Sequence, residues 1–165
     1  MSKPVYAAIE AGGTKFVLAL GHADGELLAQ TRIPTGTPAQ TLPAACDWLR
    51  AAAERLGAPA ALGIASFGPL QLNADASNHG ELLTTPKPGW SGTDLAGPFA
   101  RAFGCPVAID TDVNGAALAE SRWGAARDQH AALYLTIGTG VGGGAVIDGK
   151  LLHGLSHPEM GHIRV

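Results

Sequence analysis

Polar residues that could do acid–base chemistry gather where an apolar segment, PVAI, meets a helix-like one, NGAALAE. They are Asp110, Asp112 and Asn114. An aspartate at such a junction can simply cap the helix, because its carboxylate accepts hydrogen bonds from the free N–H groups of the first turn. Three polar side chains exceed what capping needs, and the carboxyl ends of strands are where α/β folds bind ligands. Capping and service as a general base for a hydroxyl both stay open.

The segment IEAGGTKF, residues 9–16, follows the apolar run VYAAI. Gly12 and Gly13 would let a phosphate approach the backbone N–H groups, and Thr14 adds a hydroxyl donor. A hairpin turn between two strands explains the same residues equally well. The segment is not a P-loop, because the spacing differs and a strand follows where a helix should.

A second glycine cluster, IGTGVGGG at residues 137–144, follows the strand-like ALYLTI. Gly138, Gly140 and Gly143 fit G-x-G-x-x-G, which is typical of dinucleotide binding only when a helix opens at the last glycine. Here GAVIDGK predicts a strand and a hairpin turn instead. Two glycine hairpins, each with a threonine, could grip a polyphosphate from two sides.

A polar segment near the end, SHPEMGH, contains His157, Glu159 and His162. A polar loop without any ligand is the plainest interpretation. Glutamate and histidine could also hydrogen-bond a polyol. His162 could bind zinc only with ligands from elsewhere, because a structural zinc needs four protein ligands.

The elements that must position these residues alternate between strand and helix periods. Residues 5–33 predict three antiparallel strands, and a polar loop is expected at residues 73–91. The later elements are helices at 39–56, near 92–103 and at 112–123, and strands at 61–66, 106–110, 132–137, 143–147 and 150–152. The class is therefore α/β, with a boundary in the polar segment 124–131 that divides the chain into 1–126 and 127–165.

Composition excludes several classes of protein. A hydrophobic fraction of 46% with 15% charged residues is typical of a globular chain rather than a disordered one. The net charge of −3 gives no reason to expect nucleic acid or an anionic membrane as a partner. No signal peptide or membrane span is predicted, and Cys46 and Cys105 form no cysteine motif, so we expect a reducing cytoplasm.

Taken together, IEAGGTKF, ASFGPL, TTPKPGW, DTDVNGAALAE, IGTGVGGG and SHPEMGH, in this order, resemble the ROK sugar kinases and their bacterial fructokinase branch. The resemblance runs from residue 5 to the last residue. It implies an actin-like (RNase H-like) sugar-kinase lobe with βββαβα order, followed by the first strands of a truncated second lobe. The order of the predicted elements agrees with this fold.

The resemblance also implies roles for single residues. Asp112 matches the catalytic base, and Glu10 the acidic position near magnesium. The ATP-binding or phosphate-binding positions are Gly12, Gly13, Thr14, Lys15, Gly138, Thr139, Gly140 and Gly142. The sugar-binding positions are Gly68, Pro69, Thr111, Asp112, Glu159 and His162. The family histidine that matches His162 ligates a structural zinc in many members. Because the family's zinc cysteines lie beyond this sequence, zinc is expected only in a full-length enzyme.

Thr111 and the pair His157-Pro158 depart from the glucokinase pattern and match the fructokinase branch. ATP-dependent phosphorylation of D-fructose to fructose 6-phosphate, with magnesium, is therefore expected; a broader glucose or mannose kinase, or a sugar-binding remnant without turnover, stays open. A ROK repressor would need a DNA-binding segment before residue 9, where there is no room. The family suggests a homodimer. The chain alone should be inactive, retain no zinc, and dimerise through residues 131–152 or aggregate.

Overall fold

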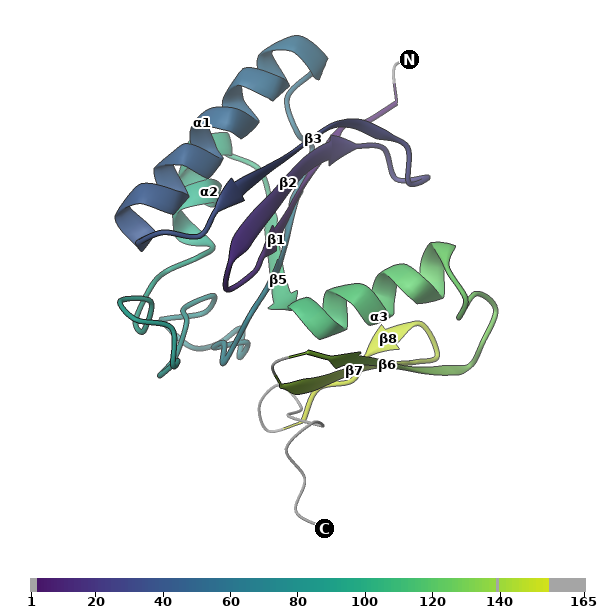
Figure 1. The fold of residues 1–165 in the computed structure, drawn as a ribbon. Coiled ribbons are helices and arrows are strands. Elements are labelled where there is room, and N and C mark those ends of the chain that lie inside the picture. The colour runs from purple at the N-terminus through teal and green to yellow at the C-terminus, as the bar shows by residue number, and fades with distance from the viewer. Residues whose placement is uncertain (1–2, 139, 155–165) are drawn as a thin grey trace.

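The structure is a computed structural model that describes residues 3–138 and 140–154. A five-stranded sheet with the order β3-β2-β1-β4-β5 forms the larger part of the molecule (Figure 1). Its strands are β1 (Tyr6–Ala11), β2 (Lys15–Gly21), β3 (Leu27–Pro34), β4 (Leu62–Ser66) and β5 (Val107–Thr111). The pairs β1–β2 and β2–β3 are antiparallel, whereas β4 pairs in parallel with both β1 and β5. The predicted meander of three strands is confirmed.

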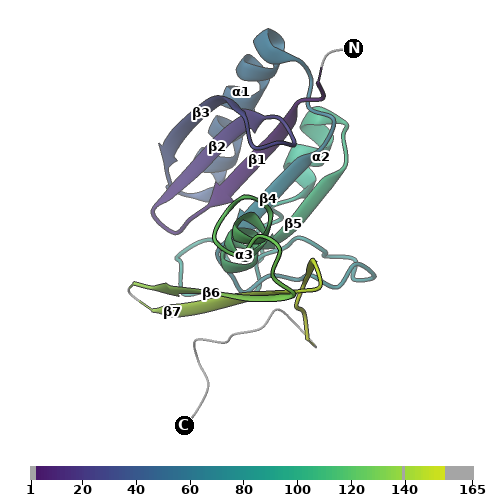
Figure 2. The ribbon, with the colours of Figure 1, turned by 90° about the vertical axis from the view of Figure 1, so that its right-hand side faces the viewer.

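One face of this sheet carries the core. Alternation along the chain buries Ala7, Ile9 and Ala11 of β1 on that face, where α1 (Pro38–Leu56) and α2 (Gly97–Phe103) cover the sheet (Figure 2). Helix α1 presents its buried side chains at helical spacing: Leu42, Ala45, Cys46, Leu49 and Ala52. The periodicity that predicted this helix is therefore the periodicity of its contact with the sheet.

The third helix, α3 (Asp112–Trp123), lies between the five-stranded sheet and a second sheet (Figure 1). The second sheet is antiparallel, with the order β6 (Ala131–Ile137), β7 (Val141–Ile147) and β8 (Lys150–Leu151). The first turn of α3 packs so closely that a Cβ on Gly144 would lie 2.4 Å from the Val113 carbonyl oxygen. A Cβ on Gly115 would lie 2.6 Å from that of Ala65 in β4. Glycine at both positions lets one helix contact both sheets.

The second sheet buries one face and leaves the other open. Gly142 and Gly144 of β7 face α3, whereas Leu133, Leu135 and Ile137 of β6 are 59%, 52% and 81% exposed. Val141 and Ile147 of β7 continue this open apolar face. The strands predicted at residues 132–152 are confirmed in their positions. The boundary at residues 126 and 127 falls in the turn between α3 and β6 and stays a prediction.

Two sequence predictions differ from the structure. The helix expected near residue 92 begins at Gly97, because Asp94 forms a bridge with Glu81 and Leu95 donates its N–H to Gly80. The loop expected to be simply polar at 73–91 contains two fully buried residues, Leu82 and Trp90. The burial of Leu82 and Trp90 could not be predicted from the sequence, because their neighbours in the chain are mostly polar. These two side chains join the core only through tertiary contacts.

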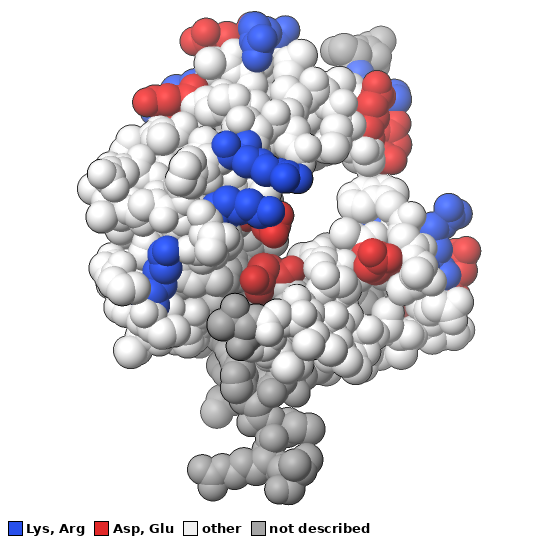
Figure 3. Space-filling view, in the orientation of Figure 1, with Lys and Arg blue, Asp and Glu red and all other residues white. Residues whose placement is uncertain are grey.

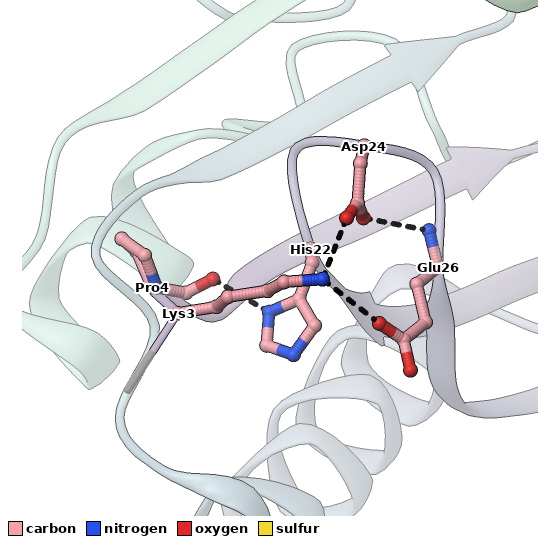
Figure 4. Close-up of polar contacts among 5 residues, drawn as sticks. All are labelled: Lys3, Pro4, His22, Asp24 and Glu26. Carbon is pink, nitrogen blue, oxygen red and sulfur yellow. Dashed lines mark hydrogen bonds and ion pairs between the residues drawn. The ribbon is translucent and has the colours of Figure 1, made fainter. Parts of the chain in front are cut away.

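The amino-terminal segment is tied to the β2–β3 turn by charged side chains (Figure 4). Lys3 Nζ lies 2.8 Å from Asp24 Oδ2 and 3.4 Å from Glu26 Oε2. The hydrogen bond from Lys3, followed by that from the Glu26 N–H, holds the pKa of Asp24 below its usual value, and Asp24 in turn raises the pKa of Lys3.

Among the described residues, no helix is both long and apolar enough to cross a bilayer.

Candidate active site

A cleft of about 1050 Å³ brings together most of the segments singled out above. Its walls come from the β1–β2 turn, the Gly68-Pro69 segment, the loop at 85–88, the start of α3 and the β6–β7 turn. The lining residues are Gly13, Thr14, Phe67, Gly68, Pro69, Thr85, Pro86, Lys87, Pro88, Thr111, Asp112, Val113, Thr136, Gly138, Gly140, Val141, Gly142 and Gly143. The two glycine turns therefore face one space together with Asp112, although more than 100 residues separate them in the sequence.

Asp112 is the first residue of α3 and lies half-buried in the cleft wall. The helix is capped by Thr111, whose Oγ1 accepts a hydrogen bond of 3.2 Å from the Asn114 N–H. Asp112 Oδ1 accepts the N–H of Val113 at 2.9 Å. The N-cap that the sequence left open for Asp112 is therefore supplied by its neighbour Thr111, and Asp112 lines the cleft.

Asp110 has a different setting. Its Oδ1 accepts hydrogen bonds from the Thr111 N–H at 2.7 Å and from Asn114 Nδ2 at 2.9 Å. Its Oδ2 lies 2.7 Å from His153 Nε2, in the segment after β8. Asp110 is not among the residues that line the cleft. The polar excess around α3 thus divides into a carboxylate at the cleft, Asp112, and a supporting network around Asp110.

The glycines in the two turns differ in why a residue without a side chain is suited to each position. Gly12 makes the β1–β2 turn tight: its N–H donates to the Lys15 carbonyl at 3.0 Å, and a Cβ would lie 2.7 Å from that oxygen. A Cβ on Gly13, Gly138 or Gly140 would meet nothing within 4 Å. These three glycines are therefore not required for packing, and they leave space beside the backbone on the cleft side.

The cleft includes many of the predicted binding residues: Gly13, Thr14, Gly68, Pro69, Thr111, Asp112, Gly138, Gly140 and Gly142. Gly12, Lys15 and Glu10 lie nearby in β1, β2 or their turn but do not line it. Thr139, His157, Glu159 and His162 lie outside the described residues. The sequence analysis quoted TTPKPGW but gave no role to Lys87, which does line the cleft.

Residues 6–165 match the profile of the ROK family. The chain belongs to the ROK family. It is 53% identical to a fructokinase of Zymomonas mobilis over 161 residues, which cover 97% of this chain and 54% of that protein. It is 42% identical to a fructokinase of Pediococcus pentosaceus over 158 residues, 96% of this chain and 53% of that one.

A ROK family glucokinase from Streptomyces griseus, solved in complex with glucose and AMPPNP, superposes with a TM-score of 0.82 at 29% identity. The match covers 98% of this chain and 51% of the glucokinase. The α/β, actin-like fold expected from the sequence is thereby confirmed. The chain spans about half the length of the relatives it matches.

The residues present fit a magnesium ion that arrives with a nucleotide. Such an ion needs only one or two protein carboxylates, because phosphates and water supply the other ligands. Asp112 is in the cleft, and Glu10 alternates with the buried residues of β1, so it lies on the face of the sheet that α3 approaches. Zinc has no comparable support: within 3–138 and 140–154, no three His, Cys, Asp or Glu residues are grouped to hold a metal.

Proposed function

We propose that this chain supplies the first lobe of an ATP-dependent hexose kinase with D-fructose as its main substrate. The observation that supports this best is that Asp112 lines the same cleft as the two glycine turns. The similarity to the fructokinases of Zymomonas mobilis and Pediococcus pentosaceus supports fructose as the substrate. The glucokinase from Streptomyces griseus supports glucose as an alternative substrate. Mannose also stays open as a substrate.

In the proposed reaction, Asp112 takes the proton from the 6-hydroxyl of the sugar as that oxygen attacks the γ-phosphorus. The new O–P bond forms while the bond to the β-phosphate oxygen breaks, and ADP leaves with the electron pair. The N–H groups and hydroxyls of the two turns, including Thr14, donate to the phosphate oxygens. Glu10 and Asp112 would hold the ligand shell of a magnesium ion bound with the nucleotide, and such an ion would neutralise charge on those oxygens.

The sugar would lie on the side of Gly68, Pro69 and Thr111. Glu159 and His162 are proposed as further sugar contacts on the strength of their match to the family signature. Residues 127–165 are proposed as the start of the second lobe, and a homodimer in the cytoplasm as the form of the whole protein. Free Cys46 and Cys105 agree with a reducing compartment.

The test is a coupled ADP-release assay with fructose, glucose and mannose. It should be run on the 165-residue chain and on this chain fused to the C-terminal half of the Zymomonas mobilis relative, with ATP and magnesium. We expect turnover only in the fusion, because closure of a second lobe must exclude water and align the phosphate with the hydroxyl. Steady turnover of about 1 s⁻¹ or more by the chain alone would contradict that expectation.

Asp112→Asn in the fusion should lower turnover by about 10²–10⁴-fold and leave sugar binding largely intact, because it removes the base but keeps the shape. Asp47→Asn, on the exposed side of α1, is the matched control. Near-normal turnover of the Asp112 variant would remove that residue from the role. A fusion that binds fructose but never releases ADP would favour the alternative of a sugar-binding protein without turnover.

A further inference from the structure

One basic side chain is found among the described residues that line the cleft. Within residues 3–138 and 140–154, Lys87 is the only lysine, arginine or histidine in the lining, and Asp112 is the only carboxylate. The other lining residues are glycine, proline, threonine, valine and phenylalanine, which carry no charge. A nucleotide triphosphate brings several negative charges into this space, and a cation placed there would stabilise them strongly.

Lys87 is joined to the first glycine turn. Its Nζ donates a hydrogen bond to the Gly13 carbonyl oxygen, a contact between residues 74 positions apart in the sequence. A lysine ammonium has three donors, so this bond leaves two for another acceptor. A Cβ on Gly13 would meet nothing within 4 Å, so there is room for a ligand beside the same turn.

The loop that bears Lys87 is held firmly by its neighbours. Trp90 is fully buried, with its ring 5.7 Å from those of Phe16 and Phe67, and its Nε1 donates to the Gly36 carbonyl at 3.0 Å. Prolines at 86 and 88 flank the lysine and restrict its backbone. The ammonium group is therefore positioned before any ligand arrives, which lowers the entropy cost of using it.

We propose that Lys87, which lines the same cleft as Asp112, contacts the γ-phosphoryl group of the nucleotide. This rests on the proposed function, because it assigns the phosphate that is transferred. The lysine that the sequence analysis placed at the phosphates, Lys15, is exposed at the start of β2 and does not line the cleft. A purely structural Lys87, which only links its loop to Gly13, is the competing interpretation.

Lysine footprinting of the 165-residue chain tests the contact directly. The chain is acetylated at low dose with and without millimolar Mg·ATP, Mg·ADP or tripolyphosphate, at matched ionic strength, and each lysine is quantified by mass spectrometry. Lys87 should lose about tenfold of its reactivity with ATP and tripolyphosphate and less with ADP, because a charge-assisted bond shields the amine. Lys150, exposed on β8, is the control and should not change beyond the general effect of salt.

Equal protection of Lys87 by ADP and ATP would overturn the assignment to the γ-phosphate. Protection of Lys15 in place of Lys87, or no protection beyond that of Lys150, would overturn the contact itself. Neither outcome depends on turnover of a sugar. Protection of Lys87 by ATP in the chain, with no phosphorylation of any hexose by the fusion, would refute the proposed function and leave this contact standing.

A second measurement separates the ligand contact from the structural link. Tripolyphosphate should raise the melting temperature of the chain and of Lys150→Met by the same amount, because a ligand that binds the folded state stabilises it. Lys87→Met should lose most of this increase, and Lys87→Arg should keep part of it, because it retains the charge. If Lys87→Met lowers the melting temperature without ligand but keeps the full ligand-induced increase, the lysine is only structural and the proposal is wrong.

Discussion

Both sheets of this chain contact α3, but they differ in how much of their remaining apolar surface is covered. In the five-stranded sheet, the core face is covered by α1 and α2, and residues such as Phe16 and Leu18 are fully buried. In the second sheet, α3 covers one face, but Leu133, Leu135 and Ile137 stand exposed on the other. Several large apolar side chains exposed on one face indicate a surface that another part of a longer protein, or another molecule, covers.

The comparison teaches where the stability of the chain resides. The first sheet has its core face covered by α1 and α2, whereas the second sheet is covered by α3 on one face and exposed on the other. A notch between the first sheet and α3, about 760 Å³ in volume and visible in Figure 3, adds to the surface left open. We therefore expect substitutions to act on folding in the first sheet and on association in the second.

The largest effect is expected for matched leucines in the two sheets. Leu18→Ala in β2 should lower the free energy of unfolding by about 2–5 kcal/mol, because it opens a cavity in a buried core. Leu135→Ala in β6 should change it by less than about 0.5 kcal/mol. Urea denaturation followed by circular dichroism measures both. Equal losses would show that the open face is covered in solution.

A smaller effect is expected where the second sheet meets α3. Gly144→Ala should cost about 1–3 kcal/mol, because its methyl group would press on the Val113 carbonyl and force the helix away from β7. Gly140→Ala, which meets nothing within 4 Å, is the control for an added methyl group. A Gly144 variant as stable as the Gly140 variant would mean that α3 does not rest on β7 in solution.

Self-association should depend on the open face alone. Lysine in place of Leu133 and Ile137 should weaken association of the 165-residue chain by at least about tenfold, because charged side chains oppose edge and face contacts between sheets. Light scattering after size-exclusion chromatography gives the mass at several concentrations. Unchanged association would place the contact elsewhere, with the notch beside α3 as the next candidate.

The smallest effect concerns the charged tie near the amino terminus. Because the folded pKa of Asp24 lies below its unfolded value, the tie stabilises the fold above about pH 4 and the contribution is lost as the pH falls through the folded pKa. Lys3→Met should therefore flatten the pH dependence of stability below that pH, with little change in stability elsewhere because the pair is exposed. Thermal melts across this range measure it, and an identical profile for the variant would rule out the tie.

Local patterns in the sequence predicted much of this architecture. The three strands expected in residues 5–33 and the helix expected at residues 112–123 depend on neighbours in the chain, and both are where the local pattern predicted them. The helix expected from residue 92 failed because a bridge between Glu81 and Asp94 occupies its first residues. Tertiary pairing of this kind has no local signal.

The glycine turns and Asp112, which the sequence analysis singled out, line the cleft, but no local pattern indicated that Lys87 lines it as well. A lysine between two prolines reads as a solvated loop residue, and its meeting with Gly13 depends on the burial of Trp90, which no local pattern indicates. The role of Asp110 was open for a related reason. Its partner His153 follows β8, 43 positions later in the chain, so the sequence could not distinguish a supporting aspartate from a base.

The glycine contacts of α3 have a mechanical consequence. Because Gly115 brings the helix against β4 and Gly144 brings β7 against Val113, the first turn of α3 has no slack toward either sheet. If one sheet rotates relative to the other, the peptide beside Asp112 has to move with it. A change in the angle between the two sheets would therefore shift the Asp112 carboxylate.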